Sequence, residues 1–181
     1  RWGWCFRMPT VRLSGRPCTT MPHSGRKTWL CRDSRSTSGS SRRWQPWIFP
    51  GWAINDRTCF PAPRQTFLEG WITQPDAVAL GCLQGDDLQG YGVIRRCGDG
   101  CKVGPLFAND AATAQRLFAR LREFAAGGAV YIDAPENNPA ALELVRDHEM
   151  VEVFGCARMY LGPAPALAHE HVFGVTTFEL G

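Results

Sequence analysis

The eight cysteines are the residues best suited to bind a metal ion or to form disulfides. They stand at positions 5, 18, 31, 59, 82, 97, 101 and 156, so only Cys97 and Cys101 are close in sequence. No histidine and no second cysteine pair stands near them, whereas a structural zinc site needs four such ligands. The spacing therefore predicts reduced thiols in a cytoplasmic protein, and no bound metal.

Two junctions between a strand and a helix contain polar residues that begin the helix. Residues 102–107 read as a strand, after which Asn109 and Asp110 supply a helix cap. Residues 129–134 read as a second, buried strand, after which Asn138 caps a helix with Pro139 at its first position. Because a helix joins the two strands, we expect them to be parallel neighbours.

The remaining elements follow from hydrophobic periodicity. The first of the two helices has apolar residues at the i, i+3, i+4, i+7 positions of one face: Ala114, Leu117, Phe118, Leu121, Phe124 and Ala125. The second presents Ala141, Leu142 and Val145. A short helix is predicted at residues 64–74, and strands at residues 77–83, 88–95, 151–161 and 172–180. This order predicts an α+β fold with a mixed, mostly antiparallel sheet flanked by helices.

The composition changes near residue 53. All seven serines and six of the seven tryptophans precede it, whereas no alanine or glutamate does. The first 60 residues carry 11 Lys and Arg against 2 Asp and Glu, and the other 121 carry 9 against 15. We therefore predict two parts, a non-native or disordered basic segment at residues 1–52 and a folded domain at residues 53–181.

Three interpretations of residues 1–52 remain open. Arg42, Arg43, Trp44 and Trp47 could contact phosphates and stack on bases in a nucleic-acid-binding arm. The segment could also be an inert tail, or a translation of the wrong reading frame. We favour the frame error, because disordered arms are usually poor in tryptophan and cysteine. We accordingly expect no nucleic-acid partner, and no packed strand or helix from this segment.

Nothing in the sequence predicts contact with a membrane. No apolar run approaches the roughly 18 residues that a membrane-spanning helix needs. The start of the chain lacks the apolar stretch of a secretory signal and does not begin with methionine, which indicates a fragment.

The order of elements and the residues at their junctions resemble the GCN5-related N-acetyltransferase superfamily. One likeness is Val-Gly-Pro at residues 103–105, where the family has a V-x-P before its cofactor helix. Another runs from residues 130–133 through Asn138 to residues 148–151. Two stretches near the C-terminus, residues 157–160 and 173–181, look most like the end of the C-terminal lobe of two-lobed members. The likeness begins at about Ile54, so the family's first strand would fall in residues 1–52, and we expect the sheet to lack it.

The resemblance implies that acetyl-CoA is the co-substrate and that a helix start holds its pyrophosphate through free backbone amides. The positions that would border the cofactor are carried over from the family's motifs. They are Phe107, Ala108, Asn109, Asp110, Ala111, Ala112, Asn138 and Ala141.

Three positions depart from the family's pattern. Residues 108–113 contain no glycine and no basic residue, and a carboxylate at Asp110 about 4 Å from a phosphate charge would repel it by roughly 4 kcal/mol. Val145 stands where the family often has a tyrosine acid. Glu149 stands where it usually has glycine, at a cost on the order of 1 kcal/mol in the left-handed conformation.

No catalytic residue is assigned. By chemical type alone the candidates for an acid are Glu143, Asp147, Glu152 and Tyr160. The predicted function is an acetyl-CoA-dependent N-acetyltransferase acting on an amine, either a small molecule or a protein. The alternative is a non-catalytic lobe that packs on, or regulates, an N-terminal acetyltransferase lobe.

Overall fold

The computed structural model describes residues 2–13, 27–32 and 51–180. The described residues contain eight strands, four α-helices and two short 3-10 helices. In chain order these are β1 (Trp2–Leu13), β2 (Lys27–Arg32), α1 (Gly51–Cys59), α2 (Gln65–Thr73), β3 (Ala77–Gln84), β4 (Asp87–Cys97), β5 (Gly100–Ala108), α3 (Ala111–Leu121), η1 (Arg122–Ala125), β6 (Val130–Asp133), α4 (Pro139–Asp147), β7 (Val151–Leu161), η2 (His169–His171) and β8 (Val172–Gly174).

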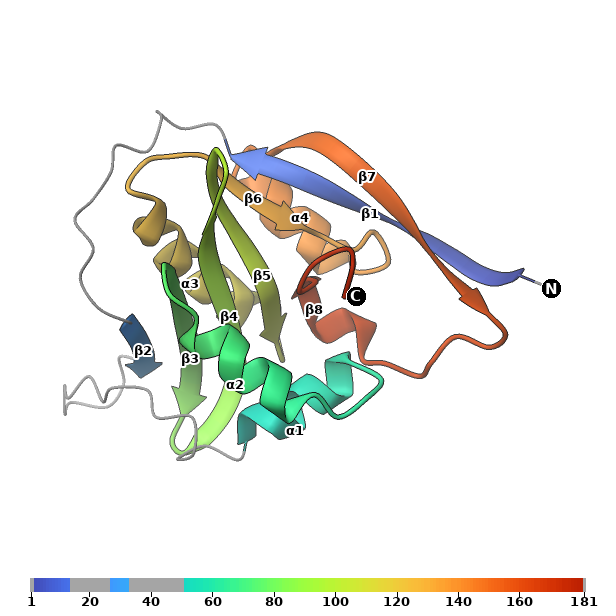
Figure 1. Cartoon of the computed structure of the whole chain (residues 1–181), viewed down its shortest axis with the longest axis horizontal. Coiled ribbons are helices and arrows are strands. Elements are labelled where there is room, and N and C mark those ends of the chain that lie inside the picture. Colours follow the sequence, from blue (N-terminus) through green and yellow to red (C-terminus); the bar gives the residue numbers. More distant parts are fainter. Residues whose placement is uncertain (1, 14–26, 33–50, 181) are drawn as a thin grey trace.

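The described strands form one mixed sheet in the order β2-β3-β4-β5-β6-β1-β7, with β8 paired to β5 (Figure 1). The pairs β3/β4, β4/β5, β1/β6, β1/β7 and β5/β8 are antiparallel, whereas β2/β3 and β5/β6 are parallel. The expected mixed, mostly antiparallel sheet and the parallel β5/β6 pair are therefore confirmed.

Helices cover both faces of the sheet, and alternate strand residues show which helix covers which face. Ala79 and Val93 pack with α2 in one apolar cluster, whereas Leu80 and Ile94 pack with α3 in another. Figure 1 shows α2 in front of β3 and β4, with α3 and α4 behind the sheet. The helices therefore sandwich the strands that carry the predicted site.

Strand β1 differs from what the sequence predicts for residues 1–52. It lies between β6 and β7, with Val11 opposite Ile132 of β6 and opposite Glu152 of β7. Val11 is buried in the main core. The insertion gives hydrogen-bonding partners to two strands that would otherwise have open edges, which is a physical reason for the difference. Strand β2 likewise extends the sheet beside β3.

The other predictions for the first part of the chain are not decided by the fold. The stretch that contains Arg42, Arg43, Trp44 and Trp47 lies outside the described residues. The frame-error hypothesis concerns the coding DNA, and it stays a prediction, as does the division of the chain at residue 53.

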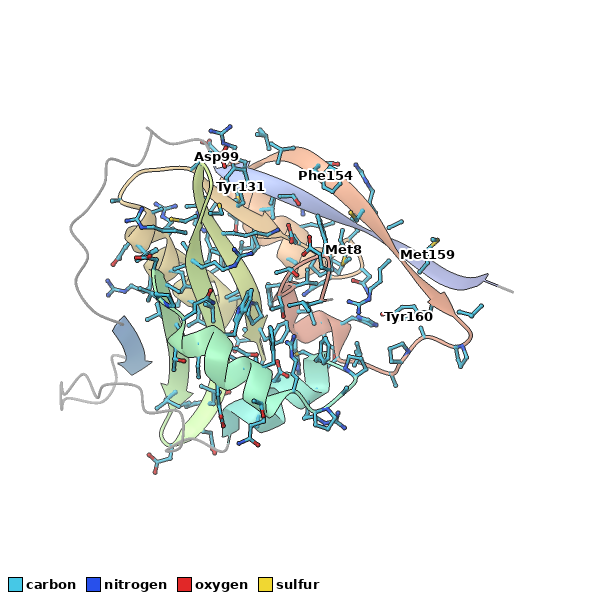
Figure 2. All side chains as sticks on the ribbon, in the orientation of Figure 1. Met8, Asp99, Tyr131, Phe154, Met159 and Tyr160 are labelled. Atoms are coloured by element: carbon cyan, nitrogen blue, oxygen red, sulfur yellow. The ribbon has the colours of Figure 1, made fainter. Side chains whose placement is uncertain are left out.

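Strand β7 is the last strand of the sheet and leaves most of its side chains in solvent. Together with β1 it forms a ribbon that extends away from the helices (Figure 1), and Figure 2 shows Phe154, Met159 and Tyr160 along it. Phe154 packs on Phe178, with 5.9 Å between the ring centroids. The exposed large apolar residues of this strand are Val151, Val153, Phe154, Met159 and Leu161.

Glu149 has the left-handed backbone expected from its place after α4, with φ of 52°. Replacing Glu149 with glycine should raise the free energy of unfolding by about 1 kcal/mol, because glycine adopts this conformation without steric cost. Chemical denaturation would measure the change. Glu143→Gly inside the same helix is the control and should lower stability by about 1 kcal/mol. A loss of stability with Glu149→Gly would contradict the interpretation.

Candidate functional site

The opening turn of α3 follows directly on β5 and faces solvent. Phe107 and Ala108, the last residues of β5, are buried, whereas the next four residues are exposed: Asn109, Asp110, Ala111 and Ala112. An exposed helix start offers free backbone amides and a partial positive charge to an anion. In this respect the turn resembles the phosphate site that the sequence predicts.

The side chain of Asp110 takes up part of that turn. One carboxylate oxygen accepts a 2.8 Å hydrogen bond from the Thr113 amide, and the other accepts one of 2.9 Å from the Thr113 hydroxyl. Partial burial raises the pKa of Asp110, but the bonds from Thr113 and the charge of Arg116 together lower it below its usual value. The group is therefore a carboxylate at neutral pH, and it lies in the turn where the sequence predicts a phosphate site.

Asn109 connects this turn to the helices on the other face. Its side-chain amide donates to Gln89 Oε1 at 3.2 Å, and its oxygen accepts from Asn55 Nδ2 at 3.3 Å. Because Asn55 belongs to α1, the loop after β5 and the first helix are held together.

The start of α4 has a second polar residue with two functions. Asn138 is buried, and its side-chain oxygen accepts bonds from the Ala140 and Ala141 amides, which caps the helix as predicted. Its side-chain amide donates to the carbonyl oxygens of Glu170 and Val172, at 3.1 and 2.9 Å. Asn138 thus joins α4 to β8.

Strands β5 and β6 separate after a short parallel pairing, and β8 lies where they part. The pairing covers Cys101–Val103 of β5, whereas further along β5 Leu106 lies opposite Gly174, and Phe107 opposite Val172. On the other side, the Val175 amide donates to the carbonyl oxygen of Asp133 at 3.0 Å. Figure 1 shows β8 beside the end of β5.

The structure therefore brings the eight predicted residues together but divides them into two groups. Asn109, Asp110, Ala111 and Ala112 form the exposed turn. The other four, Phe107, Ala108, Asn138 and Ala141, are buried. Phe107 packs with Val172, and Ala141 belongs to the same core cluster as Phe173. The prediction that these residues bind a cofactor stays a prediction.

In this arrangement the residues do not fit acetyl-CoA. The Asp110 carboxylate holds the Thr113 amide, one of those that the pyrophosphate would need, and β8 fills the separation between β5 and β6. We therefore derive no catalytic step through the cofactor.

The candidate acids have contacts elsewhere. Glu143 faces Arg146 at 3.9 Å, Asp147 accepts from Gln115, and Glu152 pairs with Arg7. Tyr160 lies on β7 (Figure 2). Val145, where the resemblance places a tyrosine, is buried in the core. None of these side chains is placed by its contacts beside the opening turn of α3.

A buried polar cluster beneath Phe107 was missed by the sequence interpretation. Asp56 accepts hydrogen bonds from Tyr91 Oη at 2.7 Å and from Arg64 Nη2 at 2.7 Å. The Tyr91 ring meets Phe107 edge to face, with 5.6 Å between centroids. Burial, together with the charge and the hydrogen bond of Asp56, raises the pKa of Tyr91, so the phenol stays protonated. No periodic pattern marks Asp56, because its partners are distant in sequence.

A second polar group joins β5, β6 and β1. Asp133, which has no exposed surface, pairs with Lys102 Nζ at 2.7 Å and accepts a 2.7 Å hydrogen bond from Thr10 Oγ1. These contacts fix the end of β6 whose backbone holds Val175.

Within the described part of the chain, no three His, Cys, Asp or Glu side chains are grouped as metal ligands. Cys59, Cys82, Cys97, Cys101 and Cys156 are not in disulfide bonds. No described helix is both long enough and apolar enough to span a membrane.

Comparison with known proteins gives concordant results. The family model described as "Acetyltransferase (GNAT) domain" matches residues 54–174. The holothin acyltransferase of Pseudoalteromonas sp. (strain SANK 73390) is 30% identical over 120 residues, which cover 66% of this chain and 41% of that protein. A Pyrococcus horikoshii protein assigned as an acetyltransferase has a crystal structure that superposes with a TM-score of 0.65 at 22% identity. That match covers 97% of this chain and 52% of the other, so the chain spans about half or less of each protein.

Proposed function

Because the chain belongs to the GCN5-related N-acetyltransferase (GNAT) superfamily, we propose that it is an acetyl-CoA-dependent N-acetyltransferase domain whose cofactor cleft is closed in the described arrangement. The observation that carries the proposal is the exposed opening turn of α3, placed directly after the strand that parts from β6. A sheet that opens beside a helix start is suited to an extended ligand with an anionic end. The acceptor is an amine of a small molecule or a protein.

The relatives support acyl transfer in general terms. The Pseudoalteromonas protein is described as an acyltransferase that acts on holothin, and the match covers 41% of it.

A second candidate function is favoured by Asp110. If its carboxylate permanently holds the Thr113 amide of the opening turn, the chain is a non-catalytic lobe that packs on, or regulates, an N-terminal acetyltransferase lobe. The absence of a tyrosine at Val145 favours the same candidate.

Binding of acetyl-CoA by the full chain, measured by titration calorimetry, separates the candidates. We expect Asp110→Gly to lower the dissociation constant at least tenfold, because it removes a repulsion of up to roughly 4 kcal/mol and frees the Thr113 amide. Glycine is an adequate helix cap, so α3 should remain folded.

The matched control is Asp110→Asn, which removes the charge but keeps a side chain that caps the helix. Its gain in affinity should be smaller than that of Asp110→Gly. If neither variant binds acetyl-CoA while α3 stays folded by circular dichroism, the acetyltransferase proposal is wrong and the non-catalytic lobe is favoured.

A further inference from the structure

The residues that fill the separation between β5 and β6 form one continuous buried stretch. All six residues of 172–177, named here the closing segment, are buried, although only three of them belong to β8. They follow a proline-containing connection from β7 whose residues are exposed or half-buried. A loop-like stretch at the end of the described chain is thus buried in the middle of the molecule, which is unusual for irregular backbone.

The closing segment is held by its backbone and by its apolar side chains, which belong to two core clusters. Strand β5 pairs with it at Leu106 and Phe107, and the Asp133 carbonyl oxygen accepts from Val175. In contrast, the Thr176 hydroxyl is buried and has no hydrogen-bond partner among the described residues. A buried hydroxyl without a partner has an uncompensated cost of desolvation, which lowers the free energy needed to release the segment.

Two glycines provide the space that the closing segment needs. A Cβ atom on Gly104 of β5 would lie 2.5 Å from the Thr176 carbonyl oxygen and 2.7 Å from that of Val175. A Cβ atom on Gly174 would lie 2.8 Å from Ile132 Cδ1 of β6. At Gly104 a side chain would therefore meet backbone atoms of the segment, whereas at Gly174 the Ile132 side chain would have to shift.

Asn138 holds the closing segment from the side of α4. Its side-chain oxygen caps α4, so the cap alone would be served by serine or aspartate. The side-chain amide adds the two bonds to the carbonyl oxygens of Glu170 and Val172, where the closing segment begins. Asn138 is also one of the positions that the sequence assigns to the cofactor.

We propose that the closing segment is a releasable intramolecular inhibitor, which occupies the cleft between β5 and β6 and is latched by Asn138. Its release opens the cleft to an extended ligand. The identification of that ligand as acetyl-CoA rests on the proposed function, whereas the release itself does not.

The test uses the full chain with Asn138→Ser, which keeps a helix-capping oxygen but removes both donated bonds. Loss of the two bonds to the Glu170 and Val172 carbonyl oxygens should raise the population of the arrangement with the closing segment released by about tenfold or more. Hydrogen exchange of the amides of residues 172–177 should accelerate by that factor, while the amides of α4 remain protected. The dissociation constant for acetyl-CoA should fall by the same factor.

A second variant should displace the closing segment from the side of β5. Gly104→Ala places a methyl group against the Thr176 and Val175 carbonyl oxygens and should also accelerate exchange of residues 172–177. Gly98→Ala is the control, because a Cβ atom there meets nothing within 4 Å.

The outcomes separate the inference from the proposed function. Unchanged exchange of residues 172–177 in both variants overturns the inference. Faster exchange with an acetyl-CoA affinity equal to that of the wild type also overturns it, and leaves the proposed function intact. Faster exchange with no acetyl-CoA binding in any variant, including Asp110→Gly, supports the release and overturns the proposed function.

Discussion

Replacing Asp56 with alanine is expected to lower the free energy of unfolding by about 3–5 kcal/mol. Asp56 is 1% exposed, and its carboxylate is bound by Arg64, whose side chain is 8% exposed. Arg64 also donates to Asp56 through Nε at 2.9 Å. Removing the carboxylate leaves a buried guanidinium without its counter-charge, which is among the most destabilising single changes.

The loss of stability expected for Asp56→Ala depends on the burial of the carboxylate, which an exposed control position can demonstrate. Asp87→Ala removes the same carboxylate from an exposed position at the start of β4, and should change stability by less than about 0.5 kcal/mol. Tyr91→Phe removes only the hydrogen bond from the phenol to Asp56 and should cost about 1.5–3 kcal/mol. Denaturation of the three variants would measure these values. A cost for Asp56→Ala no larger than that for Asp87→Ala would contradict the buried pair.

Replacing Asp133 with alanine should cost about 3 kcal/mol, less than the loss at Asp56. Asp133 is fully buried, but its partner Lys102 keeps 19% of its side chain exposed and can turn toward water. The Thr10 hydroxyl would lose its acceptor as well. The expected cost is therefore that of a broken ion pair in which one member can be solvated again.

The hydrogen bond between Thr10 of β1 and Asp133 of β6 allows a test of whether β1 belongs to the native sheet. Thr10→Val keeps the shape of the side chain and removes the bond to Asp133, so it should cost about 1.5–3 kcal/mol. Arg7→Ala, an exposed change on the same strand, should cost less than about 1 kcal/mol. If Thr10→Val leaves the free energy of unfolding unchanged, residues 2–13 do not pair with β6. That is the result expected from the sequence interpretation of residues 1–52.

The elements predicted from the sequence are those that local patterns determine. The stripe of Leu117, Phe118 and Leu121 gave α3, and all three residues are buried. Asp110 and Asn138 cap their helices as expected. Strand β7 has the predicted bounds, Val151–Leu161. Each of these features depends on residues that are close to one another in the sequence.

The features that were missed depend on contacts between distant residues. The pairing of β1 with β6 and β7 joins the two ends of the chain, and no local pattern specifies a strand's partner. The last strand was expected at residues 172–180 but ends at Gly174, because the chain then turns across the end of β6. Helix α1 has no strong apolar stripe, and its buried Asp56 is satisfied by residues 8 and 35 positions away.

The sequence predicted where the two helix starts lie, but not that β8 fills the space between β5 and β6. The motifs placed both helix starts beside the parting of β5 and β6, where the structure has them. That Asn138 would bind the closing segment could not be inferred from sequence, since an asparagine that caps a helix leaves its amide group free for any nearby acceptor.

The most direct test of the account is hydrogen exchange of the Asn138→Ser chain with and without saturating acetyl-CoA. If the cofactor and residues 172–177 compete for one cleft, acetyl-CoA should accelerate exchange across residues 172–177 and slow it at Ala111, Ala112 and Thr113. Binding of acetyl-CoA that leaves the exchange of residues 172–177 unchanged would place the cofactor elsewhere and contradict the account.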